Sequence, residues 1–329
     1  MKTLRTSPAS PARRRLLLAA LAVALLPGAA GADVATDEDR YRVLEFDWQD
    51  TARERAVPVR LYLPRSASRA QPVPLVVFSH GIGGSRAGYS YLGRHWAGQG
   101  FASLHLQHVG SDRSVWFGNP FGLPARLHDA AQEGEVLARV GDLRFALDRL
   151  LAGSEGERID RERIAAAGHS YGANTTLLAV GARIERDGRR LALRDARLKA
   201  AVLISAPPFY GEASPAVVLG GIDVPSLHIT ATDDVIRIPG YYSPADDRVA
   251  VFDATGGPRK ALAVFDGGSH SMFTDRAGTG GAQLNAQVKA ATPALALAFL
   301  RQVFGLGGDE AWRAWPKDHR AILARFVAG

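Results

Sequence analysis

The sequence of 329 residues contains no cysteine at all. This absence excludes disulfide bonds, a thiolate nucleophile and metal sites built on cysteine, and it makes the chain indifferent to the redox state of its compartment. The remaining composition is that of a globular protein, with 47% hydrophobic and 22% charged residues. A chain of this length and composition can bury one large core.

The net charge of the chain is also small once the N-terminal segment is set aside. The formal net charge is +7, and five of the positive charges precede residue 16, carried by Lys2, Arg5, Arg13, Arg14 and Arg15. The rest of the chain therefore carries +2, which is too little to form an electrostatic surface for DNA or RNA. We expect no nucleic-acid partner.

A short apolar run, LLLAALAVALL from Leu16 to Leu26, directly follows these basic residues. It is too short to span a bilayer comfortably, and small residues up to Ala32 come after it, as in a secretory signal peptide. We expect residues 1–32 to be cleaved, leaving an exported protein in the periplasm or outside the cell without a stable membrane anchor. The arginine cluster fits both Sec and twin-arginine export, and the alternative is an uncleaved anchor or a chance apolar segment.

Strand-like and helix-like patterns alternate after this segment. PLVVFSHGIGG (residues 74–84) is a continuous apolar run that ends in a glycine turn, typical of a buried parallel strand. Residues 136–151 place their apolar side chains on one face of a helix. Further strand-like runs lie at 57–64, 101–107, 164–167, 200–204, 226–231 and 261–265, and a further helical stretch lies at 288–300. The alternation predicts an α/β fold with a mostly parallel sheet and helices on both faces, as one domain over residues 38–329.

The most informative motif is AAAGHSYGANT, which places Ser170 between Gly168 and Gly172. A strand-like run precedes the serine and a helical pattern follows it. Gly-x-Ser-x-Gly in this context is typical of a nucleophile elbow, in which the serine takes a strained backbone conformation and exposes its hydroxyl. The catalytic crevice of such a sheet lies at the carboxyl ends of its strands, where Ser170 falls. The alternative is a serine in an ordinary glycine-rich loop.

A second glycine turn, FSHGIGG from Phe78 to Gly84, follows another buried strand. Acyl transfer creates a tetrahedral oxyanion, which requires preorganised hydrogen-bond donors. We expect the backbone N–H groups of Tyr171 and Ile82 to supply this oxyanion hole, with His80 bracing the loop. The alternative is a turn that only closes its strand.

An acid and a base follow later strands. PSLHITATDDVI ends near Asp233 and Asp234, and AVFDGGSHSMF places His270 behind two glycines. The order Ser, Asp, His is that of the α/β-hydrolase fold, in which the acid holds the base in one tautomer. We expect Asp234 to be the acid, with Asp233 as the alternative.

Metal and cofactor chemistry find little support in the sequence. His105 and His108 form a short His-x-x-His pair, but neither an HExxH motif nor a carboxylate cluster accompanies it. We expect no metal and no cofactor.

The segment from Ser114 to Ala131 is rich in aromatic residues and proline. We expect Trp116, Phe117 and Phe121 to form a substrate-binding wall beside the crevice. The alternative is a surface loop that packs its aromatic side chains into the core.

Several of these stretches together resemble a known group of proteins. They are FSHGIGGSRAGYSYLGRHWAGQGF, LQHVGSD, GHSYGA, TATDDVI and GGSHSMF, and they look like secreted α/β-hydrolases related to platelet-activating-factor acetylhydrolases, bacterial polyester hydrolases and dienelactone-hydrolase-like proteins. The resemblance implies the α/β-hydrolase fold, the triad Ser170, Asp234 and His270, and an oxyanion hole at Ile82 and Tyr171. The chain departs from dienelactone hydrolases in lacking a cysteine nucleophile. It departs from animal acetylhydrolases in having SAPPF, without an acid, after the preceding strand.

The residues and the resemblance together predict an exported serine hydrolase that cleaves carboxylic esters through an acyl-enzyme. Its substrate would be a small-molecule, lipid or polymer ester. A peptidase or amidase using the same triad, and a non-catalytic exported binding scaffold, are the alternatives. The sequence carries no signal for an oligomeric state.

Overall fold

The computed structural model describes residues 37–329 except 187, 213, 239–240 and 277–280. The expected signal peptide, residues 1–32, lies outside the described residues, so its cleavage stays a prediction. Within the described part of the chain, no helix combines the length and apolar character needed to cross a membrane.

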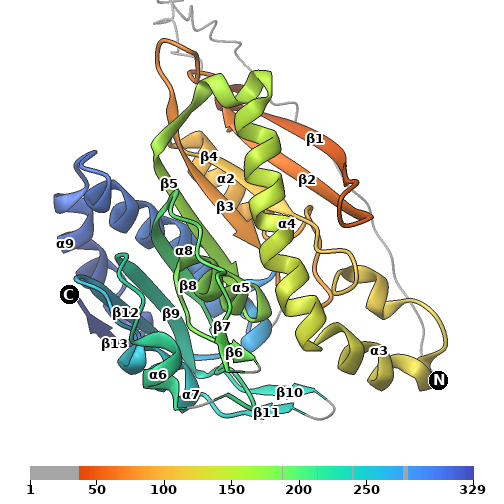
Figure 1. The fold of residues 1–329 in the computed structure, drawn as a ribbon. Helices are drawn as coiled ribbons and strands as arrows, with labels where there is room; N and C mark the ends of the chain where they lie inside the picture. The colour runs from red at the N-terminus through yellow and green to blue at the C-terminus, as the bar shows by residue number, and fades with distance from the viewer. Residues whose placement is uncertain (1–36, 187, 213, 239–240, 277–280) are drawn as a thin grey trace, which may run out of the picture. The chain divides into compact units, whose positions relative to one another are not determined.

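A nine-stranded sheet forms the centre of the fold, in the order β1-β2-β4-β3-β5-β8-β9-β12-β13 (Figure 1). The strands are β1 (Tyr41–Asp50), β2 (Arg55–Pro64), β3 (Val73–Ser79), β4 (Ala102–Leu106), β5 (Ile159–His169), β8 (Leu198–Ile204), β9 (Ser226–Asp233), β12 (Lys260–Ser269) and β13 (Leu323–Val327). Pairing is parallel from β4 through β3, β5, β8 and β9 to β12. It is antiparallel at the two ends, between β1, β2 and β4 and between β12 and β13. This topology confirms the predicted α/β fold of the α/β-hydrolase type.

Helices cover both faces of the sheet. They are α1 (Asp37–Arg40), α2 (Ser90–Gly98), α3 (Leu123–Ala130), α4 (Glu133–Ala152), α5 (Tyr171–Val180), α6 (Pro215–Leu219), α7 (Asp246–Ala254), α8 (Ala282–Val303) and α9 (Asp309–Asp318). Two short ribbons, β6 (Glu185–Arg186) with β7 (Arg189–Arg190) and β10 (Ile236–Ile238) with β11 (Tyr241–Ser243), lie outside the main sheet.

Two separate apolar clusters explain why the central strands are continuous apolar runs. On one face, α4 and α5 contribute Leu143 and Leu177 to a cluster with alternate residues of the strands. On the other face, α2 and α8 contribute Trp96 and Phe299 to a second cluster. Each central strand is therefore buried on both sides; β3 is buried at all seven of its positions. Edge strand β1, by contrast, alternates between partly buried and exposed residues.

The connections after the parallel strands bring distant parts of the sequence to one edge of the sheet. β5 runs directly into α5 at residue 170, and the loop at 80–84 follows β3. Asp234 follows β9, and a short 3-10 turn, η4 (His270–Phe273), follows β12. Because these strands are parallel, their carboxyl ends meet, and the polar residues expected to act together fall at that common edge.

Candidate active site

Ser170 occupies the sharp turn between β5 and α5. Its backbone has φ 55° and ψ −124°, a region that side chains other than glycine rarely adopt. The neighbouring glycines make this turn possible. A Cβ on Gly172 would lie 1.9 Å from the backbone oxygen of Ser79, and one on Gly168 would lie 2.1 Å from that of Gly172. Strand, turn and helix therefore pack so closely that only glycine fits on either side of the serine.

A chain of hydrogen bonds runs from Ser170 to a buried carboxylate. His270 Nε2 lies 2.8 Å from Ser170 Oγ, and His270 Nδ1 lies 2.7 Å from Asp234 Oδ1. The natural assignment of protons has Nδ1–H donating to the carboxylate, which leaves Nε2 to accept the serine O–H. The imidazole is thus held in the tautomer that can accept a proton from the serine.

The structure separates the two neighbouring aspartates. Asp234 has a fully buried side chain, and its second oxygen accepts a hydrogen bond of 2.7 Å from Thr230 Oγ1. Asp233 is the last residue of β9 and is exposed. Only Asp234 of the two contacts His270 in the described residues.

The charges around Asp234 keep it ionised. Burial by itself raises the pKa of this carboxyl, but His270 and the guanidinium of Arg248 together bring the pKa well below its usual range. Arg248 Nε is 3.7 Å from Asp234 Oδ1, and the Arg248 side chain is almost completely buried. Arg248, on α7, is therefore a buried cationic neighbour of the acid, and it was not identified from the sequence.

His169, the residue before Ser170, contacts His270 through its imidazole ring. Its Nδ1 lies 2.8 Å from the Tyr89 hydroxyl, its Nε2 lies 3.1 Å from the backbone oxygen of His270, and the two imidazole rings have centroids 4.7 Å apart. Burial is the main cause that lowers the pKa of His169, to about 3. His169 is therefore neutral near pH 7, with Nε2–H donating to the His270 carbonyl.

The loop after β3 presents a backbone N–H group beside the serine. Gly83 and Gly84 use their N–H groups within the loop region, bonding to the oxygens of Ser111 and Gly81 at 2.9 and 3.0 Å. Within the described part of the chain, no acceptor bonds the N–H of Ile82 or the N–H of Tyr171. Both residues line the same cavity as Ser170, so two backbone donors without an acceptor among the described residues belong to the walls around the serine.

His80 holds the beginning of this loop. Its Nδ1 donates to the Gly81 oxygen at 2.7 Å, and its Nε2 accepts the His108 backbone N–H at 3.1 Å. Burial and, after it, the charge of Arg139 lower the pKa of His80 well below its usual value. The ring is neutral and serves the loop as one donor and one acceptor.

Arg139 connects the loop after β3 with the start of α5, a role that was not predicted from the sequence. Its guanidinium donates to the His80 oxygen and to Thr175 Oγ1 at 2.9 Å, and it lies 4.7 Å from the centre of the Tyr171 ring. The side chain is fully buried, and burial lowers its pKa to about 10, so it remains charged at neutral pH. One cation on α4 thus ties the loop after β3 to the start of α5.

The aromatic segment contributes less to the site than expected. Trp116 Nε1 donates to the Gly83 oxygen at 2.8 Å, and the indole lines a cavity beside Ser170. Phe117 and Phe121 are 67% and 93% exposed and line neither cavity that contains Ser170. The structure therefore brings Trp116 to the site and leaves the two phenylalanines on the surface.

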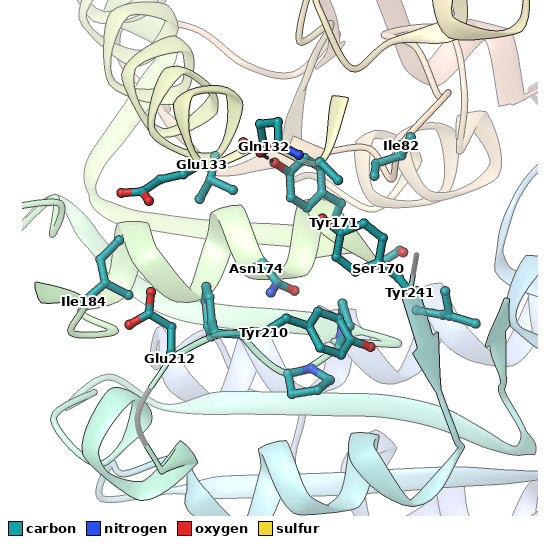
Figure 2. A pocket seen from close by; sticks show the side chains of 16 residues that line it. Ile82, Gln132, Glu133, Ser170, Tyr171, Asn174, Ile184, Tyr210, Glu212 and Tyr241 are labelled. Carbon is teal, nitrogen blue, oxygen red and sulfur yellow. Dashed lines mark hydrogen bonds between the residues drawn. The ribbon is translucent and has the colours of Figure 1, made fainter. Parts of the chain in front are cut away.

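Two cavities meet at Ser170. The first, of about 260 Å³, extends along α5 past Tyr171 and Asn174 (Figure 2). The second, of about 310 Å³, includes His270, His169 and Trp116. Ser170 and Ile82 line both, so an ester carbonyl held at the serine has space on either side.

His105 and His108 belong to the core rather than to this site. His105 Nε2 lies 3.0 Å from Ser103 Oγ, and His108 bridges Asp142 Oδ2 and Ser79 Oγ at 3.0 and 3.1 Å. Among residues 37–329 as described, no cluster of three or more histidine, aspartate or glutamate side chains is arranged to hold a metal ion.

Comparisons with known proteins agree with this geometry in part. The family model of platelet-activating factor acetylhydrolase, isoform II, matches residues 52–119, which span β2, β3, β4 and the loop carrying Ile82. That family consists of serine esterases. No curated protein matches the chain in sequence. Over residues 52–119 the chain is similar to platelet-activating factor acetylhydrolase, isoform II, which confirms the expected resemblance to α/β-hydrolases of this kind.

Proposed function

We propose that the protein is a serine hydrolase that cleaves carboxylic esters, with Ser170, His270 and Asp234 as its catalytic triad. The observation that carries this proposal is the continuous hydrogen-bonded chain from Ser170 Oγ through His270 to the buried Asp234, with distances of 2.8 and 2.7 Å. Strained backbone at Ser170 and the adjacent free N–H groups support the same chemistry.

The reaction begins when His270 Nε2 takes the Ser170 proton and Oγ attacks the ester carbonyl carbon. The carbonyl oxygen becomes an anion, which the N–H groups of Ile82 and Tyr171 stabilise. His270 then donates its proton to the departing alkoxide, and an acyl-enzyme on Ser170 remains. Water, deprotonated by His270, attacks that acyl group and releases the acid and free Ser170. Throughout, Asp234 stabilises the imidazolium and holds its orientation.

The substrate is a small-molecule, lipid or polymer ester, and catalysis uses no metal and no cofactor. The protein acts outside the cytoplasm, in the periplasm or beyond it, after removal of residues 1–32. N-terminal sequencing of the protein recovered from its producing cells tests this point, and the expected first residue is Asp33. An N-terminus at Met1 in the mature protein would contradict export by cleavage.

A substrate panel tests the reaction class. We expect p-nitrophenyl esters of short acyl chains to be hydrolysed and peptide anilides to be left intact, with activity lost in Ser170→Ala. Faster cleavage of the anilides would make the protein a peptidase on the same triad. A wild-type protein that cleaves neither, and that Ser170→Ala does not change, would be a binding scaffold.

A further inference from the structure

The two cavities at Ser170 have different positions relative to the base. His270 lines the second cavity and is not among the residues that line the first. Because His270 Nε2 must protonate the departing alkoxide, the alcohol part of an ester lies on the His270 side. The acyl part then extends into the first cavity, along α5.

Most of the surface of this first cavity is apolar or aromatic. Its walls include Ile82, Val136, Ile184, Phe209 and Ile236. Such walls suit a short carbon chain, and by themselves they discriminate weakly between chains of similar size.

Four residues with amide or carboxylate side chains, Gln132, Glu133, Asn174 and Glu212, also line the cavity, and Asn174 among them combines burial with an oxygen that is unpaired in the described part of the chain. Asn174 lines the cavity, is only 6% exposed, and its Oδ1 has no hydrogen-bond partner among the described residues. In Figure 2 the amide lies between Tyr171 above and Tyr210 below. Asparagine is a poorer helix former than alanine or leucine. The polar side chains that follow it in α5 differ from it, because the hydroxyls of Thr175 and Thr176 donate to backbone oxygens one turn earlier. Asn174 therefore places a buried amide oxygen without a hydrogen-bond partner, among the described residues, at the wall of the cavity.

The cost of this amide depends on what fills the cavity. Water can satisfy the amide in the free enzyme, but an acyl chain that displaces the water must replace its hydrogen bonds. A plain alkyl chain leaves the amide unpaired, whereas a hydroxyl can both accept from and donate to it. Rotation of the amide about its last bond exchanges oxygen and NH₂, so either kind of hydrogen bond is accessible.

The position of Asn174 sets the position of that hydroxyl. The Asn174 N–H donates to the Ser170 backbone oxygen at 3.3 Å, so residue 174 lies one helical turn, about 5.4 Å along the axis, beyond residue 170. An acyl carbon bonded to Ser170 Oγ, with a hydroxyl on its third carbon, spans this distance with a hydrogen bond of about 2.9 Å to the amide.

Resting on the proposed esterase reaction, we infer that the first cavity is an acyl site for esters of hydroxy acids, with Asn174 as the residue that selects the hydroxyl. Leaving a buried amide unpaired costs enough to change the specificity by about 10- to 100-fold. The enzyme therefore favours a 3-hydroxyacyl ester over an ester of the same size that carries a methyl group in place of the hydroxyl.

The test compares ethyl 3-hydroxybutanoate with ethyl 3-methylbutanoate, which differ only by hydroxyl and methyl, by titrating the released acid. The measured quantity is the ratio of the two kcat/KM values in the wild type, in Asn174→Leu and in the control Ile184→Leu. Leucine has the same number and branching of side-chain heavy atoms as asparagine and makes no hydrogen bond, and Ile184→Leu reshapes the same cavity without changing its polarity. We expect a ratio of about 10 or more in the wild type and in Ile184→Leu, and a ratio near or below about 1 in Asn174→Leu.

Two results would overturn the inference while leaving the esterase proposal intact. One is the same ratio in the wild type and Asn174→Leu. The other is hydrolysis of p-nitrophenyl acetate by a wild type that prefers ethyl 3-methylbutanoate or cleaves neither of the two ethyl esters. A wild type that hydrolyses no ester at all, p-nitrophenyl acetate included, would overturn the proposed function together with the inference.

Discussion

We predict that acidification from pH 7 to pH 5 sharply lowers the free energy of unfolding of this protein. The cause is a set of buried histidines that are neutral in the folded state. Burial is the largest cause that lowers their pKa values, to about 3 for His105, His169 and His228 and to about 4 for His108. His80 is shifted in the same direction.

The sign and the pH window follow from proton linkage. In the unfolded chain each histidine binds a proton below about pH 6.5, whereas in the folded protein it stays neutral until about pH 3 to 4. The unfolded state therefore binds more protons between pH 6.5 and 4, and stability is lost as the pH falls through that window. The depressed pKa values of Asp234 and Asp142 act in the same direction but only below about pH 4, while the raised pKa of Glu135 opposes the loss.

The size of the effect is large compared with the whole stability of a domain. Each pH unit below 6.5 costs about 1.4 kcal/mol per histidine, or about 2 kcal/mol at pH 5. Four such histidines together cost about 8 kcal/mol at pH 5, whereas the total free energy of unfolding of a typical protein is about 5–15 kcal/mol. We expect the protein to be folded at pH 7 and to approach its acid unfolding midpoint near pH 5.

Urea denaturation followed by circular dichroism at half-unit steps from pH 8 to pH 5 measures this loss. His228→Asn provides the decisive variant, because His228 lies away from the site, against Phe252 and Ser226. Asparagine does not titrate, so the loss between pH 7 and pH 5 should shrink by about 2 kcal/mol in this variant. His128→Asn, at an exposed position, should leave the loss unchanged. A free energy of unfolding that stays constant from pH 7 to 5, or that falls equally in the wild type and His228→Asn, would refute the reasoning.

Three further predictions concern the site. Asp234→Asn should lower kcat by about 10⁴ because the imidazole is then held in the wrong tautomer. Asp233→Asn should change kcat by less than about 3-fold, since its carboxylate is exposed. The measurement is kcat of both variants, and the reverse ranking would make Asp233 the acid. Arg248→Met removes the cation 3.7 Å from Asp234, so the imidazolium form of the base is favoured and the acid limb of the kcat/KM profile should move to higher pH; a limb that stays in place, or moves to lower pH, contradicts this. Gly172→Ala would place a Cβ 1.9 Å from the Ser79 oxygen, so it should lower either the yield of folded protein or kcat by at least about 100-fold, and a fully active variant would show that the turn is looser than described.

Much of the site could be predicted because its residues follow buried strands. Ser170, Asp234 and His270 each come directly after a strand with an apolar run, and parallel strands bring their carboxyl ends together whatever lies between them in the sequence. The choice between Asp233 and Asp234 was harder to predict, because it depends on the residue at which β9 ends. A shift of one residue turns a side chain to the other face, and a motif alone does not show that shift.

Other features could not be read, or were not read, from the sequence. Edge strand β1 carries an alternating pattern, YRVLEFDWQD, that a strand reading could have used. Strand β13, LARFV, has no buried residue, so its sequence does not show the apolar run of a central strand. Arg139 lies three residues after Val136 and four before Leu143, on the buried side of α4, and that spacing was the available signal. Its contacts with His80 and Thr175 arise only in the folded chain.

The central claim is that Ser170 is a nucleophile activated by His270. Intact-protein mass spectrometry after reaction with a fluorophosphonate, followed by peptide mapping, tests this claim most directly, because the reagent bonds covalently only to an activated serine. The account predicts a single phosphonyl adduct on the peptide that carries Ser170 in the wild type. It predicts none in Ser170→Ala and much slower labelling in His270→Ala. An unmodified wild type, or an adduct that persists in Ser170→Ala, would contradict the account.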